Sequence, residues 1–198
     1  MDALENIMTR RSVRHFLDKP IPDDAVETIL RAGMAGPSCV NARDWSFLVT
    51  QDPEILNRMA DANGRPADPL KRAALGILVL GDLDRAFRPA PDYWVIDGAI
   101  AAQNMILAAH ALGIGSVWLG TWPQMERVDR QREVFGLPET VIPHSVIAFG
   151  YPDTEAERNP PPSSKPDDLS SRPLKDAPPP PSMEKGAFEP GRVHVDRW

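Results

Sequence analysis

The stretch YWVIDGAIAAQNMILAAHAL (93–112), followed by GIGSVWLGT (113–121), organises the rest of the sequence. Residues 93–112 are apolar on nearly every face, which predicts the central helix of a globular core. Polar residues interrupt this stretch at Asp97, Gln103, Asn104 and His110. A helix that carries these groups does not suit a bilayer, so no membrane span is expected. Gly113 suits the end of the helix, and 116–121 is predicted to be a strand.

Strands and helices follow one another irregularly on both sides of this stretch. Further strands are predicted at 45–50, 76–81 and 141–149, and helices at 3–9, 22–34, 53–62 and 123–135. Pro143 favours a last strand that begins after it or lies at a sheet edge. Because the first helices precede any strand, the order predicts either an α+β fold or a mixed three-layer sheet rather than repeated β-α-β units.

Proline divides the chain into a body and a tail. The 198 residues include 22 prolines, about twice the usual share. Residues 1–151 hold 11 of them, and the much shorter segment 152–198 holds the other 11. We predict a domain over 1–151 and a proline-rich tail over 152–198. The tail is either a disordered linker or an extended arm that docks on a surface, and its aromatic, β-branched end favours the arm.

Charge and cysteine content exclude several classes of protein. The net charge of −6 gives no overall electrostatic footprint for nucleic acid. The single cysteine, Cys39, excludes a disulfide framework within the chain. The N-terminus lacks the apolar region of a secretory signal, so we expect a cytoplasmic protein.

The first candidate site is the basic segment RRSVR (10–14). The guanidinium groups of Arg10, Arg11 and Arg14 suit a phosphate monoester, because arginine binds phosphate oxygens in pairs. The Ser12 hydroxyl adds a further donor. The alternative is a solvated basic turn in an acidic protein, which the segment favours when taken alone.

Two loops are further candidates. The stretch GPSCVNARDW (36–45) joins a predicted helix to a strand. Asn41 there can hydrogen-bond the edge of a heterocycle, although proline, serine and asparagine are also ordinary turn residues. The glycines of 113–121 lack the spacing and the strand-before-helix context of a dinucleotide fingerprint. A helix cap explains Gly113 but leaves Gly120-Thr121 unexplained.

Motifs for chemistry by side chains are missing from the sequence. It has neither a G-x-S-x-G elbow nor a P-loop. Its four histidines lack metal-ligand spacing, so no metal site is expected. If the protein is an enzyme, a cofactor should carry the chemistry.

Taken in order, these segments resemble the FMN-dependent nitroreductase family. The resemblance rests on RRSVRHF (10–16), GPSCVNARDW (36–45), Asp97 to Asn104, GIGSVWLG (113–120), FGYP (149–152) and VHVDRW (193–198). No single motif is specific, whereas the ordered set over essentially the whole chain is. It implies a three-layer α+β sandwich with a mainly antiparallel mixed sheet. It also implies an intertwined homodimer with FMN at the interface. The C-terminal arm, 152–198, then crosses onto the other subunit.

The resemblance also implies the residues of the site. Ligands of the FMN phosphate and ring edge are matched by Arg10, Arg11, Ser12 and Arg14. A segment that lies against the flavin from the partner chain is matched by Pro37, Ser38 and Asn41. A strand end that faces the reactive N5 of the flavin is matched by Trp118, Leu119, Gly120 and Thr121. Lys185 matches a basic residue of the arm, whereas Ala187 stands where the family has a second one.

The implied reaction is ping-pong and needs no catalytic side chain. NADH or NADPH delivers hydride to FMN, and a flat, electron-poor acceptor such as a nitroaromatic or a quinone then takes the electrons. Candidates for lining the acceptor pocket, or for plain core, are Tyr93, Trp94, Trp118 and Trp122. The alternatives are a flavoenzyme of the same fold with another reaction (dehydrogenation, dehalogenation or flavin destruction) and a non-catalytic flavin-binding or interaction protein. Arg43-Asp44 departs from the Gln-Pro that many members carry there.

Overall fold

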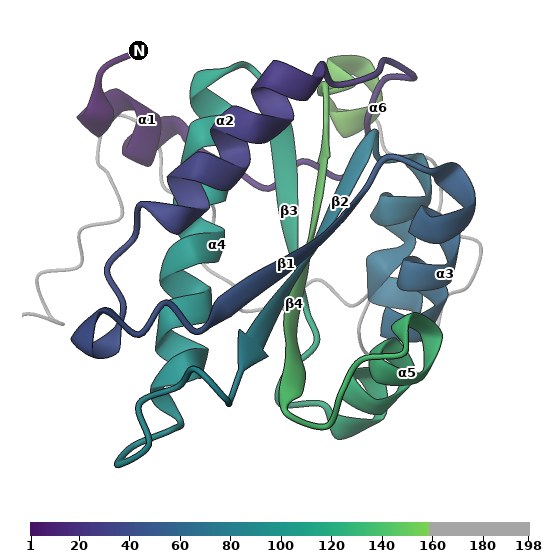
Figure 1. Ribbon diagram of the computed structural model, residues 1–198. Helices are drawn as coiled ribbons and strands as arrows, with labels where there is room; N and C mark the ends of the chain where they lie inside the picture. The colour runs from purple at the N-terminus through teal and green to yellow at the C-terminus, as the bar shows by residue number, and fades with distance from the viewer. Residues whose placement is uncertain (159–198) are drawn as a thin grey trace, which may run out of the picture. The chain divides into compact units, whose positions relative to one another are not determined.

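The structure is a computed structural model that describes residues 1–158 (Figure 1). Its contacts separate a short N-terminal unit, which ends at Arg10, from the main unit, which begins at Arg11. The N-terminal unit contains helix α1 (Ala3–Thr9), whose first turn is capped by the Asp2 carboxylate at 2.9 Å from the Glu5 amide. The predicted division into 1–151 and 152–198 mainly concerns residues beyond 158 and stays a prediction.

A four-stranded antiparallel sheet forms the middle of the main unit. The strands are β1 (Trp45–Thr50), β2 (Leu75–Asp82), β3 (Gly115–Gly120) and β4 (Val141–Gly150), in the spatial order β1-β2-β4-β3. The two central strands, β2 and β4, are buried almost throughout, which is why they read as continuous apolar runs. β1 and β3 therefore form opposite edges of the sheet.

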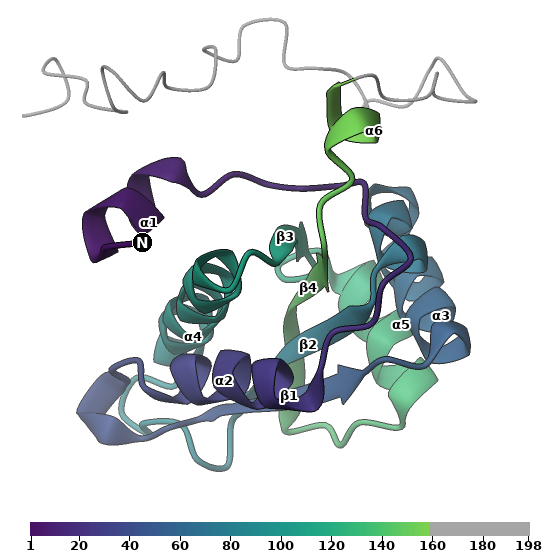
Figure 2. The same cartoon turned by 90° about the horizontal axis from the view of Figure 1, so that it is seen from above.

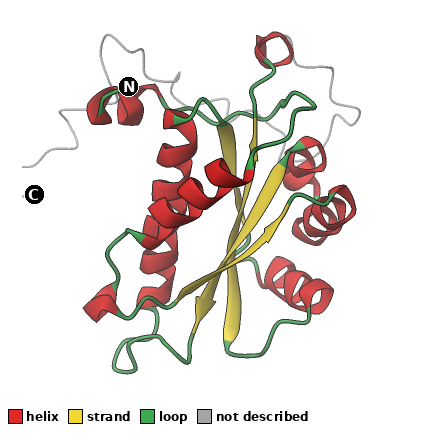
Figure 3. Ribbon diagram, turned by 45° about the horizontal axis from the view of Figure 1, so that its top comes forward, coloured by secondary structure: helices red, strands yellow, loops and turns green. Residues whose placement is uncertain are grey.

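Helices cover both faces of this sheet, as Figures 1 and 2 show. α2 (Asp23–Met34) and α4 (Tyr93–Ala111) lie on one face and pack against residues such as Ile77 and Val79. α3 (Pro53–Asn63) and α5 (Met125–Phe135) lie on the other, which includes Leu78 and Leu80. Successive side chains of β2 therefore point alternately into two separate hydrophobic cores. The three-layer α+β prediction is confirmed, and Figure 3 shows the helices on either side of the strands.

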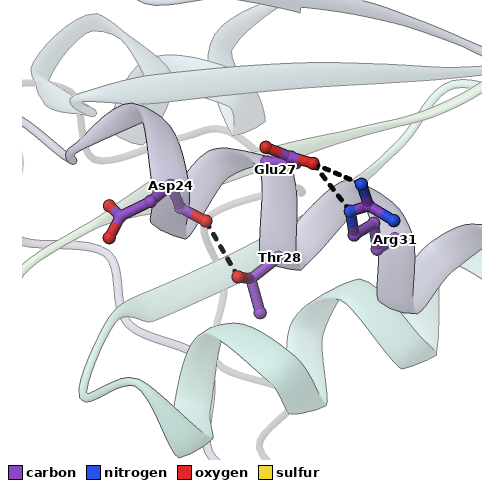
Figure 4. Close-up of polar contacts among 4 residues, drawn as sticks. All are labelled: Asp24, Glu27, Thr28 and Arg31. Carbon is purple, nitrogen blue, oxygen red and sulfur yellow. Dashed lines mark hydrogen bonds and ion pairs between the residues drawn. The ribbon is translucent and has the colours of Figure 1, made fainter.

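The outer side of α2 is held by contacts within the helix. Arg31 Nε donates to Glu27 Oε1 at 2.7 Å, and the Thr28 hydroxyl donates to the Asp24 carbonyl at 2.8 Å (Figure 4). Both pairs span one helical turn and are exposed, so they contribute only a few tenths of a kcal/mol each. The buried side, with Val26 and Ile29, supplies most of the packing.

The prediction for Pro143 is wrong, because this proline lies inside the central strand β4. Its neighbour across the sheet is Leu80, where the register between β2 and β4 shifts after Val79. A bulge is the place where a strand interior tolerates the missing proline N–H. Three short helices were also not predicted, namely η1 (Cys39–Asn41), η2 (Arg65–Arg72) and α6 (Thr154–Arg158).

The long apolar helix α4 is only partly buried. Trp94, Ala101 and Met105 point into the core, whereas Tyr93 and Ile96 stay exposed. The predicted central helix is therefore present, but one of its sides is exposed. Over the described residues, no helix combines the length and the apolar character that a membrane span requires.

Candidate functional site

The basic segment begins the main unit and runs beside the start of β3. Ser12 forms a parallel β-bridge with Ser116, and the Val13 N–H donates to the Ser116 carbonyl at 2.8 Å. Val13 is buried, while Arg11 and Arg14 are exposed and Ser12 is half-buried. The structure therefore keeps two guanidinium groups and a hydroxyl at one end of an edge strand. Arg10 belongs to the N-terminal unit, and its role at this site stays a prediction.

Two glycines allow this segment to lie close to the sheet. A Cβ on Gly115 would stand 2.8 Å from the Val13 Cβ, and a Cβ on Gly150 would stand 2.8 Å from the Phe16 ring. Real side chains do not approach so closely, so both positions require glycine. The sequence interpretation assigned no function to either glycine. Their signal, a glycine at each of two adjoining strand ends, is not specific without the structure.

The far end of β3 presents backbone rather than side chains. Val117 and Leu119 are buried with α3 and α5, while Trp118 is 37% exposed on the opposite face. A Cβ on Gly120 would meet no atom within 4 Å. The strand therefore ends beside an open space in which a flat group can approach the main chain.

A buried network fixes this strand end. The Thr121 hydroxyl donates to Asn63 Oδ1 at 2.7 Å, and Asn63 Nδ2 donates to the Gly120 carbonyl at 3.2 Å. Arg127 Nη1 donates to the same carbonyl at 2.8 Å. Asn63 and Arg127 were missed from the sequence, where Asn63-Gly64 indicated only the end of a helix. The prediction for Thr121 concerns its backbone and stays a prediction, while its side chain is buried and bound to Asn63.

The distance between the two ends of β3 limits the length of a ligand that can contact both. A strand rises about 3.3 Å per residue, so Ser116 and Gly120 lie about 13 Å apart. The donors of the basic segment are beside Ser116, and the open backbone is at Gly120. The strand thus suits an elongated ligand with an anionic end and a flat end.

Aromatic rings gather beside Trp118. His144 packs edge-on against Trp118 and Trp94, with ring centroids 5.6 and 5.8 Å apart, and Trp94 also meets Trp122 at 5.2 Å. His144 Nε2 lies 3.0 Å from the Val95 carbonyl and Nδ1 lies 3.0 Å from the Ser145 hydroxyl. Burial lowers the pKa of His144 to about 4, so the ring is neutral at neutral pH. Nε2 must then carry the proton, because a carbonyl only accepts.

The loop 36–44 lies at the other edge of the sheet. It leads into β1, while the strand end at Gly120 belongs to β3, and two strands separate them. Pro37 and Asn41 are exposed and Ser38 is half-buried. Ser38 Oγ accepts from the Arg43 amide at 2.9 Å. A single chain therefore does not bring these residues together with Gly120.

Two buried carboxyl groups underlie this loop. Both oxygens of Asp97, on α4, accept from the Cys39 amide at 3.0 and 3.1 Å. Asp44 is completely buried, and burial together with the Asp97 charge raises its pKa to about 6. Burial, followed by the charges of Asp97 and Asp44, raises the pKa of the Cys39 thiol. The sequence interpretation noted Asp44 only as a departure from the family pattern.

The remaining predictions concern Lys185, a metal site and Tyr93. Lys185 lies outside the described residues. Within 1–158, no group of three or more histidine, cysteine, aspartate or glutamate side chains is placed to hold a metal ion. Tyr93 is exposed at the start of α4.

Comparison with known proteins gives a consistent match. The model of the nitroreductase family matches residues 7–151. A protein of Methanothermobacter thermautotrophicus, whose name couples NADH dehydrogenase with NAD(P)H nitroreductase, is 38% identical over all of this chain and 88% of its own. A Bacteroides thetaiotaomicron structure with the same pair of terms in its name has a TM-score of 0.77 and 33% identity, covering 99% of this chain and 98% of its own. The Vibrio harveyi NADPH:FMN oxidoreductase in complex with NAD⁺ has a TM-score of 0.69 and 28% identity, covering 76% and 69%.

Proposed function

Because the chain belongs to the nitroreductase family, we propose that it transfers electrons from NADH or NADPH to a flat, electron-poor organic acceptor by a ping-pong mechanism. It is an NAD(P)H-dependent oxidoreductase, and FMN is its cofactor. The acceptor class, with nitroaromatics and quinones as its main members, is the part that the proposal adds. The open backbone at Gly120, at one end of a strand whose other end is bridged to the basic segment, carries the assignment.

The residues of the main unit fit FMN. A phosphate monoester needs cationic and hydroxyl donors, which Arg11, Arg14 and Ser12 supply at one end of β3. A flat ring system needs an approach to the main chain that no side chain blocks, and Gly120 gives one. The ribityl chain of FMN separates these two groups, as β3 separates their partners. Arg10 is proposed to join the phosphate donors.

Bound FMN supplies the redox chemistry as a hydride acceptor that the second substrate reoxidises. The protein's own part is to bind and orient. Asn63 and Arg127 fix the Gly120 carbonyl, so the neighbouring backbone presents one orientation to the ring. Trp118 forms an apolar wall beside it, backed by His144. His144 is neutral and held by Val95 and Ser145, so we assign it no acid–base role.

A homodimer completes the proposed site. The outer side of α4 has an apolar groove of about 470 Å³ lined by Val95, Ile96, Ala99, Ile100, Gln103 and Asn104. An apolar face of this kind suits an interface with a second subunit. The loop with Pro37, Ser38 and Asn41 projects from the opposite sheet edge, so it would reach the flavin of the partner rather than that of its own chain.

The arm 152–198, with Lys185, is proposed to cross onto the partner. The start of this arm and the residue before it are hydrogen-bonded to residues that follow the basic segment. The Leu17 N–H donates to the Tyr151 carbonyl at 2.9 Å, and the Asp153 N–H donates to the His15 carbonyl at 3.0 Å. A chain that ends after Arg158 keeps these contacts, so it should fold. We expect it to dimerise and to bind FMN more weakly than the full chain.

Initial-rate kinetics test the proposed reaction. NADH or NADPH is varied at several fixed concentrations of a quinone and, separately, of a nitroaromatic. A ping-pong mechanism gives parallel lines in double-reciprocal plots, because one product leaves before the acceptor binds. Intersecting lines indicate a ternary complex and contradict the proposal. Failure of both acceptors to be reduced, with FMN bound, contradicts the assigned acceptor class.

A further inference from the structure

Asp44 and Asp97 bring two carboxyl groups together under the loop 36–44. Asp44 stands directly before β1, where its carbonyl accepts from the Asp82 amide at 2.6 Å, and Asp97 lies in the first half of α4. Neither side chain reaches solvent, with exposed fractions of 0% for Asp44 and 2% for Asp97. The nearby charge of opposite sign comes from Arg85, in the segment between β2 and α4. Two further titratable groups lie nearby: the Cys39 thiol in the loop, and the His144 ring, which packs against α4 beside Gly98.

The hydrogen bonds of the two carboxyl groups are unequal. Asp97 accepts from the Cys39 N–H, whereas no other residue of 1–158 donates an N–H or O–H hydrogen bond to either oxygen of Asp44. A buried carboxylate without donors is strongly unfavourable, and a second carboxylate beside it adds repulsion. A proton held between Asp44 and Asp97 would give the Asp44 carboxyl group a hydrogen bond to a second side chain. The raised pKa of Asp44, caused first by burial and then by Asp97, agrees with such a proton.

The loop 36–44 has an unfavourable backbone conformation that other contacts must stabilise. Val40, Asn41 and Arg43 have φ angles of 46°, 59° and 51°. This region is unfavourable for a residue with a Cβ, and most of all for a β-branched one such as Val40. Packing does not compensate, because Val40 is 70% exposed. The loop is held instead by hydrogen bonds, and the bond from the Cys39 N–H to Asp97 ties it to α4.

We propose that Asp44 and Asp97 share one proton and that the pair, acting as positioning residues, holds the loop 36–44 in its strained conformation. With the proton in place, Asp97 is fixed where it accepts from Cys39. Without it, two adjacent carboxylates repel one another and the anchor of the loop is weakened. As far as the loop covers the flavin of the partner, this inference rests on the proposed function.

Hydrogen exchange at the Cys39 amide tests the pair in the FMN-loaded full chain. Exchange is followed from pH 5 to pH 8.5 and corrected for the intrinsic pH dependence. In the wild-type protein we expect protection to fall by about tenfold as the pH rises through 6, because the pKa of Asp44 is raised to about 6. Asp44→Asn places an amide N–H where the shared proton lies, so protection should stay high and independent of pH. Asp97→Ala removes the acceptor and should lose protection at every pH.

The control is Asp129→Asn, which changes an exposed carboxylate on α5 and should behave as the wild type. The inference is overturned if Asp44→Asn follows the wild-type profile, or if the Cys39 amide stays protected in Asp97→Ala. Should Asp97→Ala fail to fold, the Asp44→Asn profile alone decides.

The rate of FMN reduction by NADH, measured over the same pH range, separates this inference from the proposed function. If the loop covers the flavin, the wild-type rate changes through pH 6 and the Asp44→Asn rate does not. In one outcome, exchange at the Cys39 amide of Asp44→Asn is independent of pH, but the rate of FMN reduction depends on pH as in the wild type. This outcome supports the shared proton and contradicts the proposed position of the loop at the flavin. If both the exchange and the rate of FMN reduction lose their pH dependence in Asp44→Asn, the result supports both the shared proton and the position of the loop at the flavin.

Discussion

Thr121 donates its hydroxyl proton to the side-chain carbonyl of Asn63 at 2.7 Å, inside the protein and 58 residues away along the chain. Asn63 ends α3 and Thr121 follows β3, so this bond ties a helix on one face of the sheet to the edge strand. Because Asn63 also donates to the Gly120 carbonyl, one amide group fixes both residues at the strand end. The proposed flavin-facing backbone thus depends on a side chain outside the site.

Replacing Asn63 with alanine should destabilise the protein. The change removes two hydrogen bonds and leaves the buried Thr121 hydroxyl without its acceptor, which costs about 2–3 kcal/mol. Urea unfolding measures the loss. Thr121→Val is the matched control, since it keeps the bond from Asn63 to the Gly120 carbonyl. It should cost about 1–2 kcal/mol, because Asn63 Oδ1 then lacks its donor. Equal stability of Asn63→Ala and the wild type would contradict the role given to this network.

Gly120→Ala should affect FMN without affecting the fold. The added methyl group meets no protein atom within 4 Å, so the free energy of unfolding should stay within about 0.5 kcal/mol of the wild-type value. FMN binding should weaken by at least about tenfold, because the methyl group occupies the proposed approach to the ring. A fluorescence titration with FMN measures the affinity.

Gly115→Ala is the matched variant with the opposite expectation. Its Cβ would meet Val13 at 2.8 Å, so it should destabilise the fold by about 1–3 kcal/mol. Unchanged FMN affinity in Gly120→Ala would place the flavin elsewhere.

The double variant Arg10→Ala with Arg14→Ala should release FMN while the protein stays folded. Each arginine is proposed to donate to the phosphate, and the loss of both should weaken binding by about 10- to 100-fold. The measurement is again a titration, with circular dichroism to follow the fold. Arg130→Ala, which breaks the exposed pair with Glu126 on α5, should leave the affinity unchanged. The same affinity in the double variant would refute the phosphate assignment.

His144 should stay neutral down to about pH 4. Its folded pKa lies below the unfolded value of about 6.5, so its contribution to stability is present above pH 6.5 and is lost as the pH falls toward 4. The loss is up to about 3 kcal/mol. NMR titration of the ring protons should show no change for His144 between pH 8 and pH 5. A midpoint near 6.5 would contradict the buried, neutral ring.

The fold was largely predictable because its elements are strongly patterned. The apolar run that became β2 and the periodic residues of α2 each indicate one structure. Pro143 was misplaced because the bulge opposite Leu80, which accommodates it, depends on pairing between strands far apart in the sequence. η2 was missed because its Arg-Pro composition suggests a loop.

The candidate site was predictable only in its short motifs. The segment 10–14 and the strand end 118–121 are each continuous, so their chemistry is visible in the sequence. Asn63, Arg127 and the Asp44–Asp97 pair act through contacts between distant segments. No local pattern encodes such contacts. The role of Asp44 in particular depends on its complete burial, which a polar residue between Arg43 and Trp45 does not suggest.

The spectrum of the purified full chain during anaerobic titration with NADH and NADPH tests the central claim most directly. We predict that the protein binds FMN and that one or both nucleotides remove the absorbance of the oxidised flavin. Addition of a quinone or a nitroaromatic should restore it. A protein that binds FMN but keeps the oxidised spectrum with both nucleotides would contradict the assignment as an NAD(P)H-dependent reductase.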